Sequence, residues 1–147
     1  MAALGLILWF IGSFSLSAQP AVDSSRLSGM LAKPLAVVLQ RSGLSANVAV
    51  HEVEGVLRKG AHWTLYFIFG CLMFFFMRTI WGTQVSVKLW GVLVLVGVAI
   101  AALDEFHQFF VAGRSAQWND VVLDSVGTIM GLVWCIWLRE NEEERSE

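Results

Sequence analysis

The sequence predicts an all-α protein, an integral membrane bundle of four helices. Hydrophobic residues make up 56% of its 147 residues and charged residues 15%, a balance that favours a membrane protein over a soluble domain. Four apolar segments, residues 2–17, 61–78, 88–110 and 120–138, are separated by polar connections. A helix needs about 20 apolar residues to span a membrane. We therefore predict one membrane domain over residues 1–139.

The first apolar segment, residues 2–17, is short for a membrane span. The alternative is a cleaved signal peptide, since Ser15 and Ser17 form the alternating pair of small residues that cleavage prefers. However, no Lys or Arg stands before the apolar run, and a signal peptide needs basic residues there. We interpret the segment as a retained helix that Pro20 ends.

The connection between the first two spans, residues 18–60, contains a predicted amphipathic helix. Asp23-Ser24-Ser25 is a typical helix start, and Pro34 should kink the helix. The apolar residues that recur at near-helical spacing are Leu27, Met30, Leu31, Leu35, Val38 and Leu39. Helices of this kind usually lie in the membrane interface as anchors. A lid over a functional site is the alternative.

Charge argues against a nucleic-acid-binding protein, and cysteine content argues against a disulfide-stabilised or cysteine-metal protein. The net charge of −2 argues against a nucleic-acid-binding surface. Cys71 and Cys135 both lie inside apolar runs, with no disulfide framework and no metal-ligand spacing.

The loop at residues 111–119 contains Gly113, a common turn residue. The acidic tail, residues 140–147, is predicted to be disordered.

Ionisable residues recur at one depth on three spans. One membrane face is marked by the basic residues Arg78, Lys88 and Arg139. At a rise of about 1.5 Å per residue, His62, Asp104 and Asp124 lie about 22–24 Å from these markers along their own helices. The hydrocarbon core is about 30 Å thick, so all three lie just inside the opposite face. Charges in a membrane are costly and generally pair with one another.

Helical spacing places several of these residues on shared faces. On the second span Lys59, His62 and Tyr66 are at positions i, i+3 and i+7. On the third span Asp104 and Gln108 are four residues apart. Each group therefore presents one polar face.

The fourth span has a polar face that continues into small residues. Asp120 and Asp124 are four residues apart, and Gly127 and Gly131 extend the same face. Small residues let membrane helices approach closely, so this face should point inward. We expect one polar cluster formed by Lys59, His62, Asp104, Glu105, Arg114, Asp120 and Asp124, with Tyr66 and Gln108 as hydrogen-bonding partners.

The predicted cluster carries more negative than positive charge. Lys59 and Arg114 provide two cations against four carboxylates. Charges removed from water must be paired or neutralised, so His62 is protonated, a carboxyl keeps its proton, or a cation binds. Each alternative implies either a group with a shifted pKa or a site for a ligand, and both are typical of functional sites. The other interpretation is a salt-bridge network that only fixes the bundle.

These residues also form a recognisable signature. It comprises Arg58-Lys59-x-x-His62-x-x-x-Tyr66, Asp104-Glu105-x-x-Gln108, Gly113-Arg114, Asp120, Gly127 and Gly131. It resembles the VanZ-like family, named for a teicoplanin-resistance accessory protein. The resemblance implies a small multi-pass protein of the bacterial cell membrane, associated with reduced sensitivity to lipoglycopeptides, and implies no particular reaction. The family often has Asn where this chain has Asp124, and Pro where it has Ala112.

The first functional hypothesis is a membrane-embedded enzyme acting on a lipid-linked or phosphorylated envelope substrate. Lys59 and Arg114 would hold a phosphate or carboxylate. His62 and one of Asp104 or Glu105 would act as acid and base. The candidate catalytic residues are Lys59, His62, Asp104, Glu105, Arg114 and Asp120, and the candidate substrate-binding residues are Arg58, Tyr66, Gln108 and Asp124.

A candidate nucleophile is harder to find. Ser115, next to Arg114, is the best-placed hydroxyl. It lacks the Gly-x-Ser-x-Gly context, and a role as a helix N-cap explains it better.

Two other functions use similar residue types. A non-enzymatic protein would bind or translocate an anionic lipid or glycolipid while His and carboxylates relay protons. A homo-oligomer would double its four spans. A metal site from His62, Glu105, His107 and Asp124 is disfavoured, because the side chains of Glu105 and His107 diverge at i, i+2. We expect no metal or cofactor, with membrane lipids or a lipid-linked envelope precursor as partners.

Orientation is only weakly specified by the sequence. Four spans place both termini on one side, and basic residues near the span ends are nearly balanced between the two sides. We expect the termini inside and the polar layer opening outward, because the antibiotics implied by the resemblance act outside the cell.

Overall fold

The computed structural model describes residues 1–20, 26, 29–30, 32–34, 37–38, 46–82, 86–114 and 117–146. The helices bounded within these ranges are α1 (Ala2–Ser17), α3 (Ala46–Trp81), α4 (Val87–Gln108) and α5 (Trp118–Ser146). No strand occurs among the described residues. The all-α prediction is therefore confirmed.

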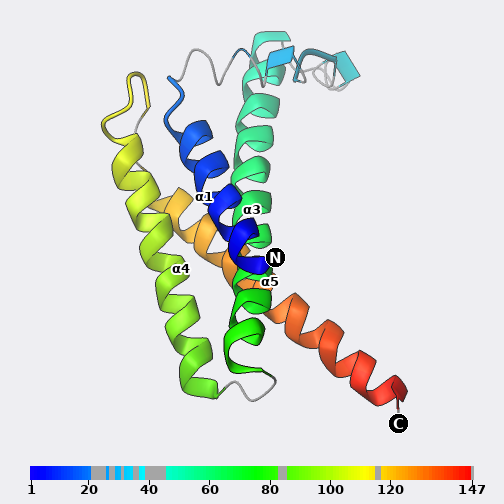
Figure 1. Ribbon diagram of the computed structural model, residues 1–147. Coiled ribbons are helices and arrows are strands. Elements are labelled where there is room, and N and C mark those ends of the chain that lie inside the picture. Colours follow the sequence, from blue (N-terminus) through cyan, green and yellow to red (C-terminus); the bar gives the residue numbers. More distant parts are fainter. Residues whose placement is uncertain are drawn as a thin grey trace.

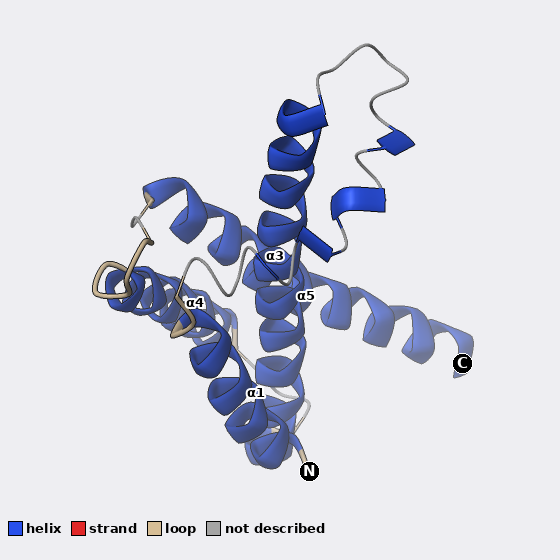
Figure 2. Cartoon of the chain, turned by 90° about the horizontal axis from the view of Figure 1, so that it is seen from above, coloured by secondary structure: helices blue, strands red, loops and turns tan. Residues whose placement is uncertain are grey.

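The helices form a bundle in which α1 and α4 run opposite to α3 and α5 (Figure 1). In the closest pair, Gly127 of α5 lies against Trp63 of α3, and Gly131 lies against Phe67. Residue numbers rise together along this contact, so α3 and α5 run in the same direction. Seen from above, α5 crosses α3 obliquely and its end projects away from the other helices (Figure 2).

Although α1 is short, it packs along α3 and reaches the loop that follows α4 (Figure 1). Met1 borders a cavity with Arg78, near the end of α3. Halfway along, the indole N–H of Trp9 donates a hydrogen bond of 2.7 Å to the carbonyl of Leu65. At the far end of α1, the carbonyl of Leu16 accepts from Arg114. Helix α1 thus lies antiparallel to α3 and ends beside the loop between α4 and α5.

Glycines set the close approach of α3 and α5. A Cβ at Gly127 would lie 2.7 Å from the backbone oxygen of Trp63. A Cβ at Gly131 would collide with the backbone oxygen of Phe67, and one at Gly70 with that of Thr128. The prediction that Gly127 and Gly131 permit close helix packing is confirmed, and Gly70 supplies the matching surface on α3.

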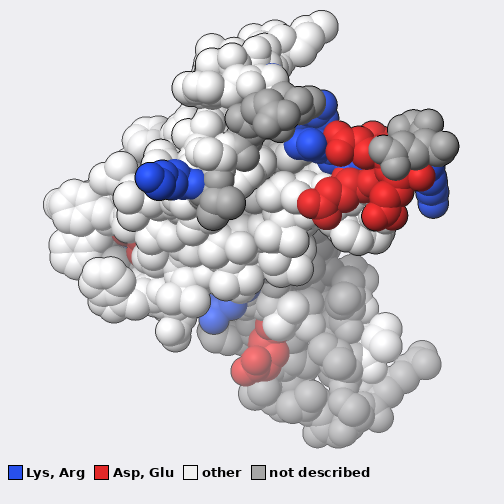
Figure 3. Space-filling model, turned by 90° about the horizontal axis from the view of Figure 1, so that it is seen from below, with Lys and Arg blue, Asp and Glu red and all other residues white. Residues whose placement is uncertain are grey.

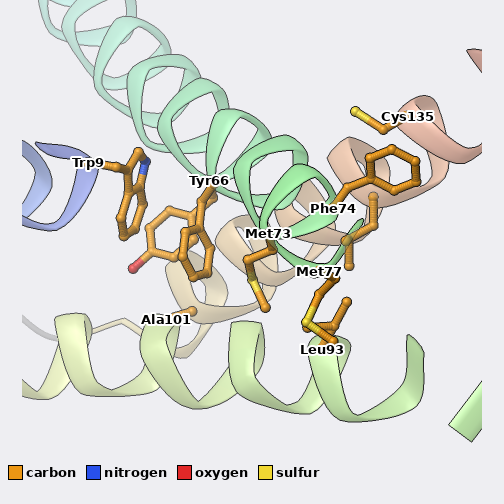
Figure 4. Packing of buried hydrophobic residues seen from close by; sticks show 10 residues of the cluster. Trp9, Tyr66, Met73, Phe74, Met77, Leu93, Ala101 and Cys135 are labelled. Carbon is orange, nitrogen blue, oxygen red and sulfur yellow. The ribbon is translucent and has the colours of Figure 1, made fainter. Parts of the chain in front are cut away.

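The buried apolar core lies where the four helices meet (Figure 4). Trp9 stacks on Phe69 with ring centroids 4.3 Å apart, and Phe74 stacks on Trp90 at 5.7 Å. The core residues are Trp9, Tyr66, Phe69, Met73, Phe74, Met77, Leu93, Ala101, Leu132 and Cys135. Because His62 lies one turn before Tyr66 on α3, the polar residues begin where this core ends.

The outer surface of the bundle has the character of a membrane protein. Large apolar side chains are exposed along all four helices, as expected for surfaces that face lipid. Within the described residues, α3, α4 and α5 each contain a stretch long and apolar enough to cross a membrane, whereas α1 is shorter. The fold is that of a helical membrane bundle.

Two helices extend beyond the predicted spans. Helix α3 begins at Ala46, well before the predicted start at residue 61, because no proline follows Pro34 to interrupt it. Residues 140–146 continue α5, which corrects the prediction of a disordered tail. Arg139 and Glu143 stabilise this end, with Nε and Oε1 2.8 Å apart at i, i+4 spacing.

The extension of α5 carries charge away from the apolar bundle. Acidic side chains gather on the side where its last turns lie, while most of the described residues seen from below are uncharged (Figure 3). The exposed acidic residues of these turns are Glu140, Glu142, Glu143 and Glu144. This end therefore suits water better than lipid.

The predicted interfacial helix lies mostly outside the described residues. Residues 26, 29–30, 32–34 and 37–38 are helical. The position of the helix relative to a membrane stays a prediction.

Candidate functional site

The site is organised by the loop that joins α4 to α5. Gly113 takes a φ of 76°, a left-handed conformation that favours glycine, and so turns the chain at the point where Arg114 follows. Arg114 points back toward α1 and α4. Its Nη1 donates to Oε1 of Gln108 at 3.0 Å, and its Nε donates to the carbonyl of Gln19 at 3.1 Å. A longer bond of 3.4 Å joins Nη2 to the carbonyl of Leu16.

Arg114 therefore acts as a clamp between three segments of the chain. Burial lowers the pKa of its guanidinium from the ordinary value, but an arginine remains protonated at neutral pH. The planar group can make several hydrogen bonds in fixed directions. In this structure those bonds hold the end of α1 against the end of α4.

Gln108 connects Arg114 to Asp104 through two hydrogen bonds. Because its Oε1 accepts from Arg114, its Nε2 is directed the other way and donates to Oδ2 of Asp104 at 3.2 Å. Gln108 is 5% exposed, so this amide is held inside the bundle. The i, i+4 relation predicted for Asp104 and Gln108 corresponds to a direct hydrogen bond.

A second polar pair joins α3 to α5. Nδ1 of His62 and Oδ2 of Asp124 are 3.5 Å apart. Asp104 completes a group of three, because one potential ligand atom from each of His62, Asp104 and Asp124 lies within 4.8 Å of the others. Three helices thus bring one side chain each to a single point.

Several buried polar atoms at this point have no hydrogen-bond partner in the described part of the chain. They include Nδ1 of His62 and Oδ1 of Asp124. Asp124 is only 1% exposed. An unsatisfied buried polar group costs roughly 1–3 kcal/mol, and more when it is charged. Such a cost suggests that something besides the protein completes the site.

Glu105 has a different position from its neighbour Asp104. Consecutive residues on a helix point about 100° apart, so Glu105 is directed toward α5. Its Oε1 accepts from the backbone N–H of Gln117, just before α5 begins. This contact fixes the entry to α5, and with it the direction from which Asp124 approaches.

The remaining candidates occupy varied positions. Tyr66 is buried and borders the same cavity as Asp104. Asp120 is half-buried, and its Oδ1 has no partner among the described residues. Arg58 and Lys59 are exposed, so they lie at the margin of the buried group. The roles predicted for these residues stay predictions, and Ser115 lies outside the described residues.

An apolar cavity of about 280 Å³ lies between α1, α3 and α4, and Asp104 is one of the residues that line it. It is lined by Trp9, Phe10, Ser13, Phe14, Tyr66, Ile100, Leu103 and Asp104. Phe10, Phe14 and Leu103 are exposed, so the cavity borders the exposed apolar surface of the bundle. A charged group in the wall of an apolar cavity is the arrangement expected for binding an amphipathic molecule.

Sequence reasoning missed the contribution of α1. The bonds from Arg114 end on the carbonyls of Leu16 and Gln19, and a backbone acceptor leaves no trace in residue type. Trp9 and Ser13 line the cavity, but a Trp and a Ser in an apolar run resemble ordinary packing residues. The sequence feature that indicates a polar end of α1 is the repetition of Ser13, Ser15 and Ser17.

Replacing Arg114 with Lys tests the clamp. We expect Arg114→Lys to lower the free energy of unfolding by about 2 kcal/mol, because a lysine keeps the charge but cannot serve Gln108 and Gln19 from one planar group. Thermal unfolding in detergent is the measurement, with exposed Arg145 changed to Lys as the control. Equal melting temperatures for both variants and the unchanged protein would contradict the clamp.

The fold and this site define a class: a helical membrane bundle whose helices enclose a cluster of His and carboxylate residues. Comparison with known families gives the particular one. The profile of the VanZ/LLP1 family matches residues 2–139, and the chain belongs to this family. Neither a curated protein nor a solved structure gave a significant match.

Proposed function

We propose that this chain is a multi-pass protein of the bacterial cell membrane that acts on an anionic, lipid-linked envelope substrate and lowers sensitivity to teicoplanin. The observation that carries the proposal is the apolar cavity that Asp104 helps to line. The cavity borders the lipid-facing surface, so a lipid can enter from the side. Its polar head would then lie against Asp104 and the neighbouring His62 and Asp124.

The cavity lining suits the apolar part of such a substrate. Trp9, Phe10 and Phe14 from α1 face Ile100 and Leu103 from α4 across it. Apolar walls with a few polar groups are typical of sites that bind small molecules. Tyr66 adds a hydroxyl near the polar end, where a head group would need a hydrogen-bond partner.

The polar end provides groups that can bind and release protons. His62 changes charge near neutral pH in ordinary surroundings, and the two carboxylates offer a base or an acid depending on their environment. Arg58 and Lys59 lie on α3 one turn before His62, at the margin of the site. We assign them the attraction of a phosphate or carboxylate, since Arg114 is engaged with protein acceptors.

Mass spectrometry of the cell envelope tests the proposal. Cells would express the unchanged protein or His62→Ala at matched membrane levels, and total lipids and lipid-linked wall precursors would be compared. Thr64→Ala is the matched control, because Thr64 is exposed on the same helix. We expect one lipid species to appear or disappear with the unchanged protein and the control, and not with His62→Ala.

Teicoplanin sensitivity separates the outcomes of this experiment. Identical lipid profiles, together with a sensitivity that still depends on His62, would replace the enzyme with a protein that binds or transports a lipid. Identical profiles and equal sensitivity in all strains would overturn the proposal.

A further inference from the structure

Three residues with metal-binding side chains converge from three different helices. His62 comes from α3, Asp104 from α4 and Asp124 from α5, and one ligand atom from each lies within 4.8 Å of the others. Far separated in sequence, they do not have the short spacing of common metal motifs. We infer that these three residues bind a divalent transition-metal ion, with Zn²⁺ as the best match.

The distance between His62 and Asp124 fits two ligands of one ion. Their nearest side-chain atoms, Nδ1 and Oδ2, are 3.5 Å apart. Two ligand atoms at about 2.0–2.1 Å from a tetrahedral ion lie about 3.3 Å apart. At this distance the two atoms can interact directly when His62 is protonated, and an ion between them would take the place of that contact.

The unsatisfied atoms at this point give an independent argument. Asp124 is 1% exposed, and its Oδ1 has no partner among the described residues. Buried polar atoms are nearly always satisfied, by protein, water or an ion. A cation between the three side chains would give the buried Oδ1 of Asp124 a partner.

Charge favours a divalent ion over a monovalent one. Two carboxylates, Asp104 and Asp124, meet at this point inside the bundle, and no arginine or lysine forms a salt bridge with either in the described part of the chain. Charges inside a membrane protein must be compensated. One divalent cation neutralises both carboxylates while leaving His62 uncharged.

The surrounding hydrogen bonds resemble the support that metal ligands usually have. Gln108 donates a hydrogen bond to Oδ2 of Asp104. Arg114 holds Gln108 in that orientation. Partners of this kind fix the direction of a ligating carboxylate, and they normally contribute to metal affinity.

The types of ligand atom indicate which ion the site would bind. An imidazole together with carboxylate oxygens suits Zn²⁺ better than Mg²⁺, which prefers oxygen ligands and retains water. Three protein ligands leave a fourth position open, as in catalytic zinc sites. Because Asp104 also borders the apolar cavity, an ion here would be positioned to polarise the anionic head group of a lipid. That catalytic use rests on the function proposed above, whereas binding of the ion does not.

Zinc titration of the purified protein tests the inference. The full chain would be prepared in detergent without a histidine tag, treated with EDTA, dialysed and titrated with ZnCl₂ by calorimetry. Metal content per chain would be measured by elemental mass spectrometry. We expect one Zn²⁺ per chain, and affinity at least about 100-fold lower in His62→Ala and in Asp104→Asn. Glu142→Gln, at an exposed carboxylate of α5, should bind as the unchanged protein does.

Two further measurements make the result decisive. Melting temperatures would establish that the variants are folded, and Asp104→Asn preserves side-chain shape at a partly exposed position. Co²⁺ in place of Zn²⁺ should give the strong visible absorption of a tetrahedral ion in the unchanged protein and in Glu142→Gln, but not in His62→Ala or Asp104→Asn.

Failure of the metal site can be distinguished from failure of the proposed function. Absence of Zn²⁺ binding by the folded protein, or equal affinity in the site variants, would overturn the metal site. In the second case the ion would be bound elsewhere, for example by Cys71 and Cys135. Neither result depends on the lipid profile, and an unchanged lipid profile would leave the binding result standing.

Discussion

Asp104→Asn is expected to abolish the proposed effect on teicoplanin sensitivity while the protein reaches the membrane at its normal level. Asp104 is where the apolar cavity, the His62–Asp124 pair and the Gln108–Arg114 chain meet. An asparagine has nearly the same shape but carries no charge and cannot act as an acid or base. A lost acid–base group typically lowers turnover by about 100-fold or more. The measurement is the teicoplanin concentration that stops growth.

The control must separate loss of function from loss of protein. Glu142→Gln removes a carboxylate from the exposed end of α5 and should leave resistance unchanged. Membrane levels of both variants would be measured by immunoblot. If Asp104→Asn lowered protein abundance in proportion to resistance, Asp104 would belong to a network that only holds the helices together.

The arrangement of the site could be predicted in part because helical periodicity constrains it. Once α3, α4 and α5 are recognised as helices, the spacing of Asp104 and Gln108 places both on one face. The glycines at Gly127 and Gly131 indicate which face of α5 turns inward. Depth along each helix follows from a constant rise per residue.

Contacts that depend on the ends of helices could not be predicted. Lys59 was placed in the cluster by its position three residues before His62, but at the margin of the bundle its side chain is exposed. The sequence leaves Asp104 and Glu105 as alternatives for the acid or base, and it does not reveal that Glu105 accepts a hydrogen bond from the backbone N–H of Gln117. Periodicity predicts which side chains share a face of a helix. Near the end of a helix, the path of the adjoining loop determines which groups those side chains contact.

The acidic tail is a second feature that could not be predicted, in this case because composition was considered without the neighbouring helix. Its composition is typical of disorder, but it directly follows a long helix, so no new nucleation is needed to continue it. The Arg139–Glu143 pair and the good helix propensity of Glu and Arg then suffice to extend α5 to Ser146. Composition alone does not reveal this coupling to a neighbouring helix.

Gly127→Leu should destabilise the bundle strongly. The first added atom, Cβ, would lie 2.7 Å from the backbone oxygen of Trp63 and 3.3 Å from the backbone nitrogen of Phe67. Backbone atoms cannot rotate away as a side chain can, so α5 must move away from α3. Overpacking of this kind costs about 3 kcal/mol, which corresponds to a fall of about 10 °C in melting temperature. Thermal unfolding in detergent measures it.

The effect of Gly127→Leu should extend to the site, because Asp124 lies one turn before Gly127 on α5. Moving α5 outward separates Asp124 from His62, so Zn²⁺ binding should weaken together with stability. Gly91→Leu is the matched control: Gly91 is exposed on α4, and a Cβ there has no neighbouring atom within 4 Å. An unchanged melting temperature for Gly127→Leu would mean that α3 and α5 do not pack through their glycines. Equal losses in both variants would point to the leucine itself and away from helix packing.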